Sequence, residues 1–228
     1  MIKAIIFDID NTLLDFMTMK SNAIKSAVDG MIKNGLDIEF DIAVKKIFDI
    51  YNEKGYEHQK VLNEFIKNTV GHIDYKILAA GIVEYKKAKD ASLSLYPGVK
   101  ETLVTLGKFG LKLGILSDAP SREAWIRMYM LDIHKIFDEV ITFNDTGFYK
   151  PAKEPFVKIV KKLGVDYSDC LMVGDWPERD IKGAKQFGMK TAYAKYGSTE
   201  YIDNSGADYE LDTIHELIEI IRKENDIL

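Results

Sequence analysis

The fold is decided near the start of the chain by residues 3–15, which read KAIIFDIDNTLLD. Residues 4–7 of this stretch, AIIF, are continuously apolar, which is typical of a central strand covered on both faces. Asp8 and Asp10 follow with one residue between them, although charge is costly to place at the mouth of a buried strand. We therefore expect the two carboxylates to have a task that offsets this cost.

Five further apolar runs follow along the chain. They are LKLGIL from residue 111, EVITF from 139, CLMV from 170, KTAYA from 190 and ADYEL from 207. Helical patterns alternate with them in SREAWIRMYML, in PFVKIVKKLG up to Gly164 and in RDIKGAKQFG up to Gly188, and TIHELIEIIRKEN predicts a last helix. This alternation of strand and helix predicts the α/β class, with a doubly wound parallel sheet.

One segment breaks the alternation. Between the first and second strands, apolar residues recur at helical spacing, for example at Ile24, Ala27, Val28 and Met31. The pattern returns from Val44 and over residues 61–70 and 75–89, which predicts about four helices. Because this is too long for a loop within an α/β unit, we expect residues 16–91 to form an inserted helical subdomain and residues 1–15 and 92–228 to form the α/β core.

Composition narrows the class of protein. The 228 residues carry a net charge of −5 with 46% hydrophobic residues, an ordinary globular profile. No block rich in Lys and Arg points to nucleic acid or to an anionic membrane surface, and no stretch is long and apolar enough to cross a bilayer. The single cysteine, Cys170, excludes an intramolecular disulfide. We expect a cytoplasmic monomer or homodimer with a small-molecule partner.

Polar residues gather just after the predicted strands. In an open parallel sheet, the ligand site lies beyond the carboxyl ends of the strands. The residues found there are Asp8, Asp10 and Thr12 after the first strand, Ser117 and Asp118 after the second, Lys150 after the third, and Asp175 and Asp180 after the fourth. Each one alone reads as a turn former, a helix cap or a surface lysine. Together they predict one site on one edge.

The carboxylates of this cluster predict a cation. Two like charges about 4 Å apart at an effective dielectric constant of about 20 cost roughly 4 kcal/mol. The four histidines are scattered and there is no second cysteine, so a zinc site is not indicated. Oxygen ligands favour Mg²⁺, which pairs readily with phosphate. Lys150 and the amides of the Ser117 turn would supply positive charge and donors for an anion.

This combination indicates phosphoryl transfer. Hydrolysis of phosphate monoesters requires both charge neutralisation and positioning. A carboxylate can attack as a nucleophile and form an aspartyl phosphate. A second acid two residues further on can protonate the leaving alkoxide and later take a proton from water.

Four ordered motifs carry a resemblance to a known family. DIDNT, LSD at Ser117, YKP at Lys150 and GDWPERD resemble the motifs of the haloacid dehalogenase superfamily, and the insert resembles the helical C1-type cap of that superfamily. The resemblance implies Asp8 as the nucleophile and Asp10 as the general acid and base. It further implies Mg²⁺ held by Asp8, the backbone carbonyl of Asp10, and Asp175.

The resemblance also implies a pocket for the phosphoryl group. Ser117 and Lys150 are the expected phosphate binders, and Asp118 stands beside them among the substrate-binding residues, with capping of the next helix as its alternative. Asp180 is expected outside the metal ligands, where it orients water on the metal or Lys150. Thr12 is expected in the same outer layer.

The second acid separates two reaction classes. Members of the superfamily that cleave carbon–halogen bonds lack it, so Asp10 implies a phosphatase. The stretches AAGIVEYKKAKDASLSLYPGV and RDIKGAKQFGMKT further resemble an archaeal branch of phosphatases whose assigned substrate is glyceraldehyde 3-phosphate. The expected function is a Mg²⁺-dependent phosphatase for a small phosphorylated metabolite, with glyceraldehyde 3-phosphate as a candidate.

Other functions stay open. A phosphotransferase or mutase shares all four motifs, and a catalytically silent binding protein can use the same fold. A phospho-accepting receiver domain fits poorly, because its lysine follows all of its acids and it has no helical insert. The fourth motif also departs from the usual pattern at Trp176 and Pro177, and the proline directs Trp176 toward extended geometry.

Overall fold

The computed structural model describes residues 1–227 and divides the chain into two compact units. The first, which we call the core unit, comprises Met1–Asp15 and the chain from Ser94 onward. The second, the helical unit, is Phe16–Leu93. Among residues 1–227, none of the helices combines the length and apolar character that a bilayer crossing requires.

The core unit is built on a six-stranded sheet in which all strands are parallel. The strands are β1 (Ala4–Phe7), β2 (Lys112–Leu116), β3 (Glu139–Ile141), β4 (Cys170–Gly174), β5 (Lys190–Ala194) and β6 (Tyr209–Leu211), in the order β3-β2-β1-β4-β5-β6. The strand order reverses at β1, which pairs with both β2 and β4. The predicted fold class and all six strands are confirmed, and the reversal marks the place where such sheets bind ligands.

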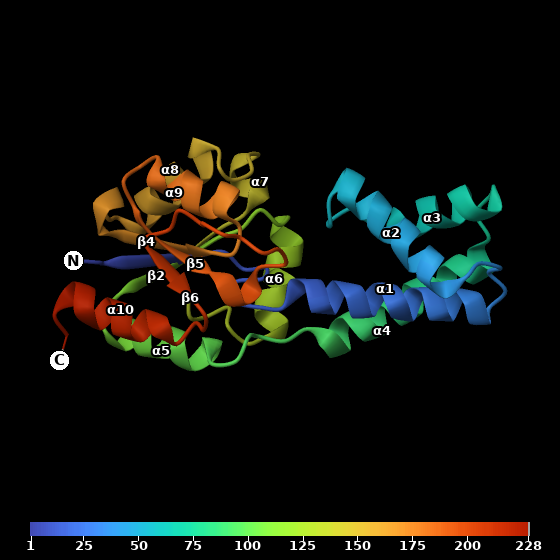
Figure 1. Ribbon diagram of the computed structural model, residues 1–228, viewed down its shortest axis with the longest axis horizontal. Helices are drawn as coiled ribbons and strands as arrows, with labels where there is room; N and C mark the ends of the chain where they lie inside the picture. The colour runs from blue at the N-terminus through green and yellow to red at the C-terminus, as the bar shows by residue number, and fades with distance from the viewer. Residues whose placement is uncertain (228) are drawn as a thin grey trace. The chain divides into compact units, whose positions relative to one another are not determined.

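Helices cover both faces of this sheet (Figure 1). They are α5 (Val99–Lys108), α6 (Ser121–Met130), α7 (Phe143–Thr146), α8 (Lys153–Leu163), α9 (Lys182–Lys185) and α10 (Glu216–Asn225). Ala4 and Ile6 pack in one cluster with residues of α8 and α9, whereas Ile5 and Phe7, which point the other way along β1, are equally buried. Burial on both sides explains why the strand is continuously apolar rather than alternating.

One predicted helix of the core unit is shorter than expected. The pattern RDIKGAKQFG predicts a helix up to Gly188, but α9 contains only four residues and follows a π-helical turn at Pro177–Ile181. In that turn, the Lys182 N–H donates to the Pro177 carbonyl, five residues back. The wider turn surrounds Asp180, whose side chain is buried and accepts from the Trp176 N–H at 3.1 Å. A tertiary requirement at Asp180 therefore overrides the helical pattern.

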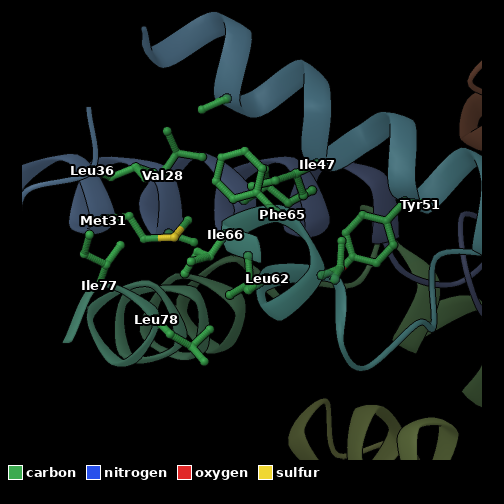
Figure 2. Packing of buried hydrophobic residues seen from close by; sticks show 14 residues of the cluster. Val28, Met31, Leu36, Ile47, Tyr51, Leu62, Phe65, Ile66, Ile77 and Leu78 are labelled. Atoms are coloured by element: carbon green, nitrogen blue, oxygen red, sulfur yellow. The ribbon is translucent and has the colours of Figure 1, made fainter. Parts of the chain in front are cut away.

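The helical unit contains four helices around a core of its own. They are α1 (Phe16–Lys33), α2 (Phe40–Lys54), α3 (Val61–Val70) and α4 (Tyr75–Ser92). Figure 2 shows apolar side chains from all four meeting in one cluster, among them Val28, Ile47, Phe65 and Leu78. α1 and α4 approach closely, because a Cβ at Gly81 would lie only 2.8 Å from the Met31 side chain. The unit thus buries the apolar face that its sequence pattern predicts.

Candidate active site

Three aspartates meet at the carboxyl edge of the sheet. Asp8 directly follows β1 and its N–H donates to the Val173 carbonyl at 2.9 Å, which holds it beside the end of β4. Asp175 directly follows β4, and Asp180 arrives through the π-helical turn. Carboxylate oxygens of Asp8, Asp175 and Asp180 lie within 4.8 Å of one another. The structure thus brings together residues that the sequence separates by up to 172 positions (180 − 8).

Lys150 binds two of these carboxylates. Its Nζ lies 2.8 Å from Asp8 Oδ1 and 2.7 Å from Asp180 Oδ1, and it donates to the Leu116 carbonyl at 2.9 Å. Only 3% of the residue is exposed. A charged group so deeply buried requires partners, and these three oxygens supply them from β1, β2 and the turn after β4.

Burial also shifts the ionisation of the cluster. It raises the pKa of Asp8 well above its usual value, with Lys150 opposing the shift and Asp180 and Asp175 adding to it. Burial, followed by the charge of Asp180, raises the pKa of Asp175 to about 7. For Lys150, burial lowers the pKa, but the charges of Asp180 and Asp8 outweigh it, so the pKa rises and the ammonium keeps its proton. When all three acids are ionised, three carboxylates and one ammonium leave an excess of negative charge.

The donor set fits a hard divalent cation. Among residues 1–227, the group of acids and histidines close enough to share an ion consists of Asp8, Asp175 and Asp180, all oxygen donors. Asp180 accepts from Lys150 and from the Trp176 N–H, which leaves Asp8 and Asp175 as the better placed metal ligands. A cation here would offset the burial and the mutual repulsion that raise the pKa values of the acids, and oxygen-only sites of this kind suit Mg²⁺.

Gly174 leaves the space that the Asp180 side chain occupies. A Cβ at position 174 would lie 2.3 Å from the Asp180 Cγ, much closer than two carbon atoms approach. The fourth motif therefore needs glycine for space. Its unusual residues do not disturb this arrangement, since Trp176 is extended, at φ −112° and ψ 97°, as expected before Pro177.

A turn after β1 carries Thr12 toward Asp175. The Thr12 Oγ1 donates to Asp175 Oδ1 at 3.1 Å, and the Tyr196 hydroxyl donates to the Thr12 carbonyl at 2.7 Å. A Cβ at Gly197 would lie 1.5 Å from the Asn11 carbonyl oxygen, so only glycine fits there. Sequence reasoning singled out Thr12 but missed the tyrosine and the glycine. Their position in the sequence could have indicated them, because both directly follow β5 and so lie at the same edge of the sheet.

Ser117 and Asp118 sit at the end of β2. The Ser117 Oγ accepts from the Ala119 N–H at 3.1 Å, which fixes the hydroxyl at the strand end. The Asp118 Oδ1 accepts from the Lys150 N–H at 2.9 Å, and Oδ2 pairs with the Arg179 guanidinium, also at 2.9 Å. The alternative that Asp118 caps the next helix is wrong, because Pro120 occupies the cap of α6. Asp118 instead joins the loops after β2, β3 and β4.

Sequence reasoning also missed Arg127, on α6. Its Nη1 donates to Asp10 Oδ2 at 2.6 Å, and 1% of the residue is exposed. A signal was present in SREAWIRMYML, where Arg127 falls at helical spacing between the apolar positions Ala124 and Met128, both fully buried. A charged residue on the buried face of a helix indicates a buried partner.

Comparison with known proteins agrees with this geometry. Residues 2–188 match the family model described as haloacid dehalogenase-like hydrolase. The chain is 36% identical over 225 residues to a glyceraldehyde 3-phosphate phosphatase of Methanocaldococcus jannaschii, covering 97% of this chain and 98% of that protein. It is 32% identical over 227 residues to a protein of the same name from Pyrococcus furiosus, covering 98% and 95% of the two chains.

The chain is also similar to a solved structure of this family. The crystal structure of a HAD phosphatase from Thermococcus onnurineus superposes with a TM-score of 0.73 at 27% identity, covering 96% of this chain and 98% of that one. The resemblance that rested on four short motifs thus extends over nearly the whole chain. The protein belongs to the haloacid dehalogenase-like hydrolase family.

Proposed function

We propose that the protein is a Mg²⁺-dependent phosphatase that hydrolyses a small phosphorylated metabolite, with glyceraldehyde 3-phosphate as the leading candidate. The observation that carries this proposal is the arrangement around Asp8. Its carboxylate has a buried lysine at 2.8 Å and two further carboxylates within 4.8 Å. A nucleophilic carboxylate, a fixed positive charge and a set of oxygen ligands are the parts that phosphoryl transfer from a monoester requires.

Asp8 and Asp175, with the backbone carbonyl of Asp10, would hold the cation. When bound, Mg²⁺ supplies positive charge that offsets the charge of the phosphoryl oxygens. Lys150 and Ser117 bind the phosphoryl group, and Asp180 keeps Lys150 in place through their contact at 2.7 Å. Asp118 acts through Lys150 in the same way, because it accepts from the Lys150 N–H.

The reaction proceeds in two balanced halves. Asp8 attacks the phosphorus atom, so an Asp8 O–P bond forms as the P–O bond to the leaving group breaks, and Asp10 gives its proton to the departing alkoxide. Asp10 then takes a proton from water, and the water oxygen bonds to the phosphorus atom as the Asp8 O–P bond breaks. Inorganic phosphate leaves and the Asp8 carboxylate is restored.

Two features support the substrate class. The two relatives from M. jannaschii and P. furiosus are both named for glyceraldehyde 3-phosphate and match this chain over almost its full length. The helical unit stands in the sequence where the family's C1-type cap is inserted, directly after the motif with Asp8 and Asp10. We assign to this unit the selection of the leaving group.

A phosphate-release assay tests the proposal. We expect the wild type to release phosphate from glyceraldehyde 3-phosphate and from 4-nitrophenyl phosphate with Mg²⁺, and to lose this activity on chelation. Asp8→Asn should abolish turnover. Asp169→Asn is the matched control, because this aspartate pairs with Lys3 at 2.6 Å, away from the cluster, and should leave turnover unchanged. Absence of wild-type turnover on both substrates would overturn the proposal, and retained turnover by Asp8→Asn would move the nucleophile elsewhere.

A panel of phosphorylated metabolites then ranks the substrates. If glyceraldehyde 3-phosphate is the substrate, its kcat/KM should exceed those of phosphoglycolate, pyrophosphate and hexose phosphates. Transfer of the phosphoryl group to a sugar without release of phosphate would instead indicate a phosphotransferase or mutase.

A further inference from the structure

A buried guanidinium faces the proposed acid and base. Arg127 Nη1 lies 2.6 Å from Asp10 Oδ2, and the arginine side chain is 2% exposed whereas that of Asp10 is 22% exposed. The guanidinium therefore holds one oxygen of the Asp10 carboxylate from the interior of the core unit. The contact joins the segment after β1 to the middle of α6, across 117 positions of sequence.

Helix α6 buries a charged residue and exposes apolar ones, the reverse of the usual distribution. It buries Arg127, while its exposed side carries four large apolar or aromatic residues, namely Trp125, Ile126, Tyr129 and Met130, which are 39–62% exposed. Burying an arginine and its partner carries a desolvation cost of several kcal/mol for each ion, and replacing such a pair as a whole by apolar side chains of similar volume is often neutral or stabilising. Stability alone therefore does not explain why the charged residue is inside.

We propose that Arg127 is a positioning residue, whose guanidinium holds the Asp10 carboxylate in the orientation that transfers protons in both halves of the reaction. This inference rests on the proposed phosphatase function. The planar guanidinium donates along fixed directions, so it constrains the carboxylate in a way that the compact, flexible ammonium of lysine does not. Misplacement of a reacting group by about 1 Å can lower a rate roughly 100-fold.

The role predicts a dependence on the leaving group. Departure of an alkoxide, as from glyceraldehyde 3-phosphate, needs a proton from Asp10, whereas nitrophenolate leaves without one. The value of kcat/KM reports only the steps up to this departure. Arg127→Met should therefore lower kcat/KM by roughly 10- to 100-fold for glyceraldehyde 3-phosphate and by less than about threefold for 4-nitrophenyl phosphate.

The second half of the reaction gives another readout. Hydrolysis of the aspartyl phosphate needs Asp10 as a base whatever the first substrate was. Rapid mixing of Arg127→Met with 4-nitrophenyl phosphate should therefore give a fast burst of about one nitrophenolate per enzyme, followed by slow turnover. A purely structural role for the arginine would lower the amount of active enzyme and would produce neither the burst nor the leaving-group split.

The experiment compares the wild type with Arg127→Met, Arg127→Lys, Asp10→Asn and the double variant Asp10→Asn/Arg127→Met. Arg122→Met is the control, because this arginine lies on the same helix with its side chain 71% exposed and pairs with Glu123. Thermal unfolding of every variant separates folding from chemistry. If Arg127→Met does not fold, Arg127→Lys carries the test, with the same split at smaller amplitude.

In the Asp10→Asn background, loss of the arginine should have little further effect on kcat/KM, because the two residues act as one unit. Arg122→Met should behave as the wild type. Equal losses on both substrates, or fully additive losses in the double variant, would overturn the role of Arg127 while leaving the phosphatase function intact. Absence of wild-type turnover would overturn the phosphatase function and this inference together.

Discussion

Replacing Lys150 by methionine should destabilise the core unit strongly. The substitution keeps an unbranched side chain but removes the ammonium from Asp8 at 2.8 Å, Asp180 at 2.7 Å and the Leu116 carbonyl at 2.9 Å. Removing one partner of a buried ion pair costs about 3–5 kcal/mol. We expect a loss near the lower end, about 3 kcal/mol, since the freed carboxylates can take up protons. The loss should be smaller at pH 5 than at pH 8 for the same reason.

Urea unfolding without divalent cations measures this loss. The sequence has two tryptophans, Trp125 and Trp176, and both lie in the core unit, so their fluorescence follows that unit. With a slope of about 3 kcal/mol per molar urea, a loss of about 3 kcal/mol moves the midpoint by about 1 M. Lys182→Met is the control, because its pair with Glu178 is exposed, at 65% and 73%, and such pairs contribute about 0–1 kcal/mol.

Unfolding of Lys150→Met and Lys182→Met at the same urea concentration would contradict this prediction. A loss for Lys150→Met that grows as the pH falls would also contradict it, since protonation should remove the uncompensated charge. Either result would mean that the contacts of the lysine with Asp8 and Asp180 do not stabilise the fold.

Further predictions concern four other positions of the core unit. Gly197→Ala should lower kcat roughly 10- to 100-fold in steady-state kinetics, since the new Cβ would meet the Asn11 carbonyl. Gly107→Ala has open space on α5 and should raise the free energy of unfolding by up to about 1 kcal/mol, measured by urea unfolding. Burial raises the pKa of the Cys170 thiol to about 12, so a thiol reagent at pH 8 should label unfolded but not native protein. Burial raises the pKa of Asp175 from 3.8 to about 7, so the metal-free fold should lose stability as the pH rises through this range. Mg²⁺ should therefore raise the melting temperature more at pH 8 than at pH 5. An equal increase at the two pH values would contradict this prediction.

Much of the fold could be predicted from local patterns. The six strands and the four helices of the helical unit follow from local apolar patterns, because short continuous apolar runs indicate strands and a helical period states which side of a helix is buried. The convergence of Asp8, Lys150, Asp175 and Asp180 followed from a single rule, that parallel strands deliver their carboxyl ends to one edge. The chemical roles of these residues stay predictions until the variants are measured.

Other features depended on how distant segments pack. The π-helical turn around Asp180 exists because its side chain reaches Lys150 and because Gly174 leaves room for it, and neither condition can be read from the helical pattern of RDIKGAKQFG. Asp118 likewise reads as a helix cap in the sequence, yet it pairs with Arg179, 61 positions away. In both cases a polar contact between loops outweighed a local preference.

The sequence by itself determined the class of fold, the family and the strand ends at which chemistry takes place, because apolar periodicity and short motifs are local properties of a chain. Only the tertiary structure decided how Asp10 is held. The spacing of Arg127 in SREAWIRMYML indicates a buried charge, but its partner lies 117 positions earlier. The packing of α6 beside the end of β1 determines which buried charges pair, and no local sequence pattern identifies a partner so far along the chain.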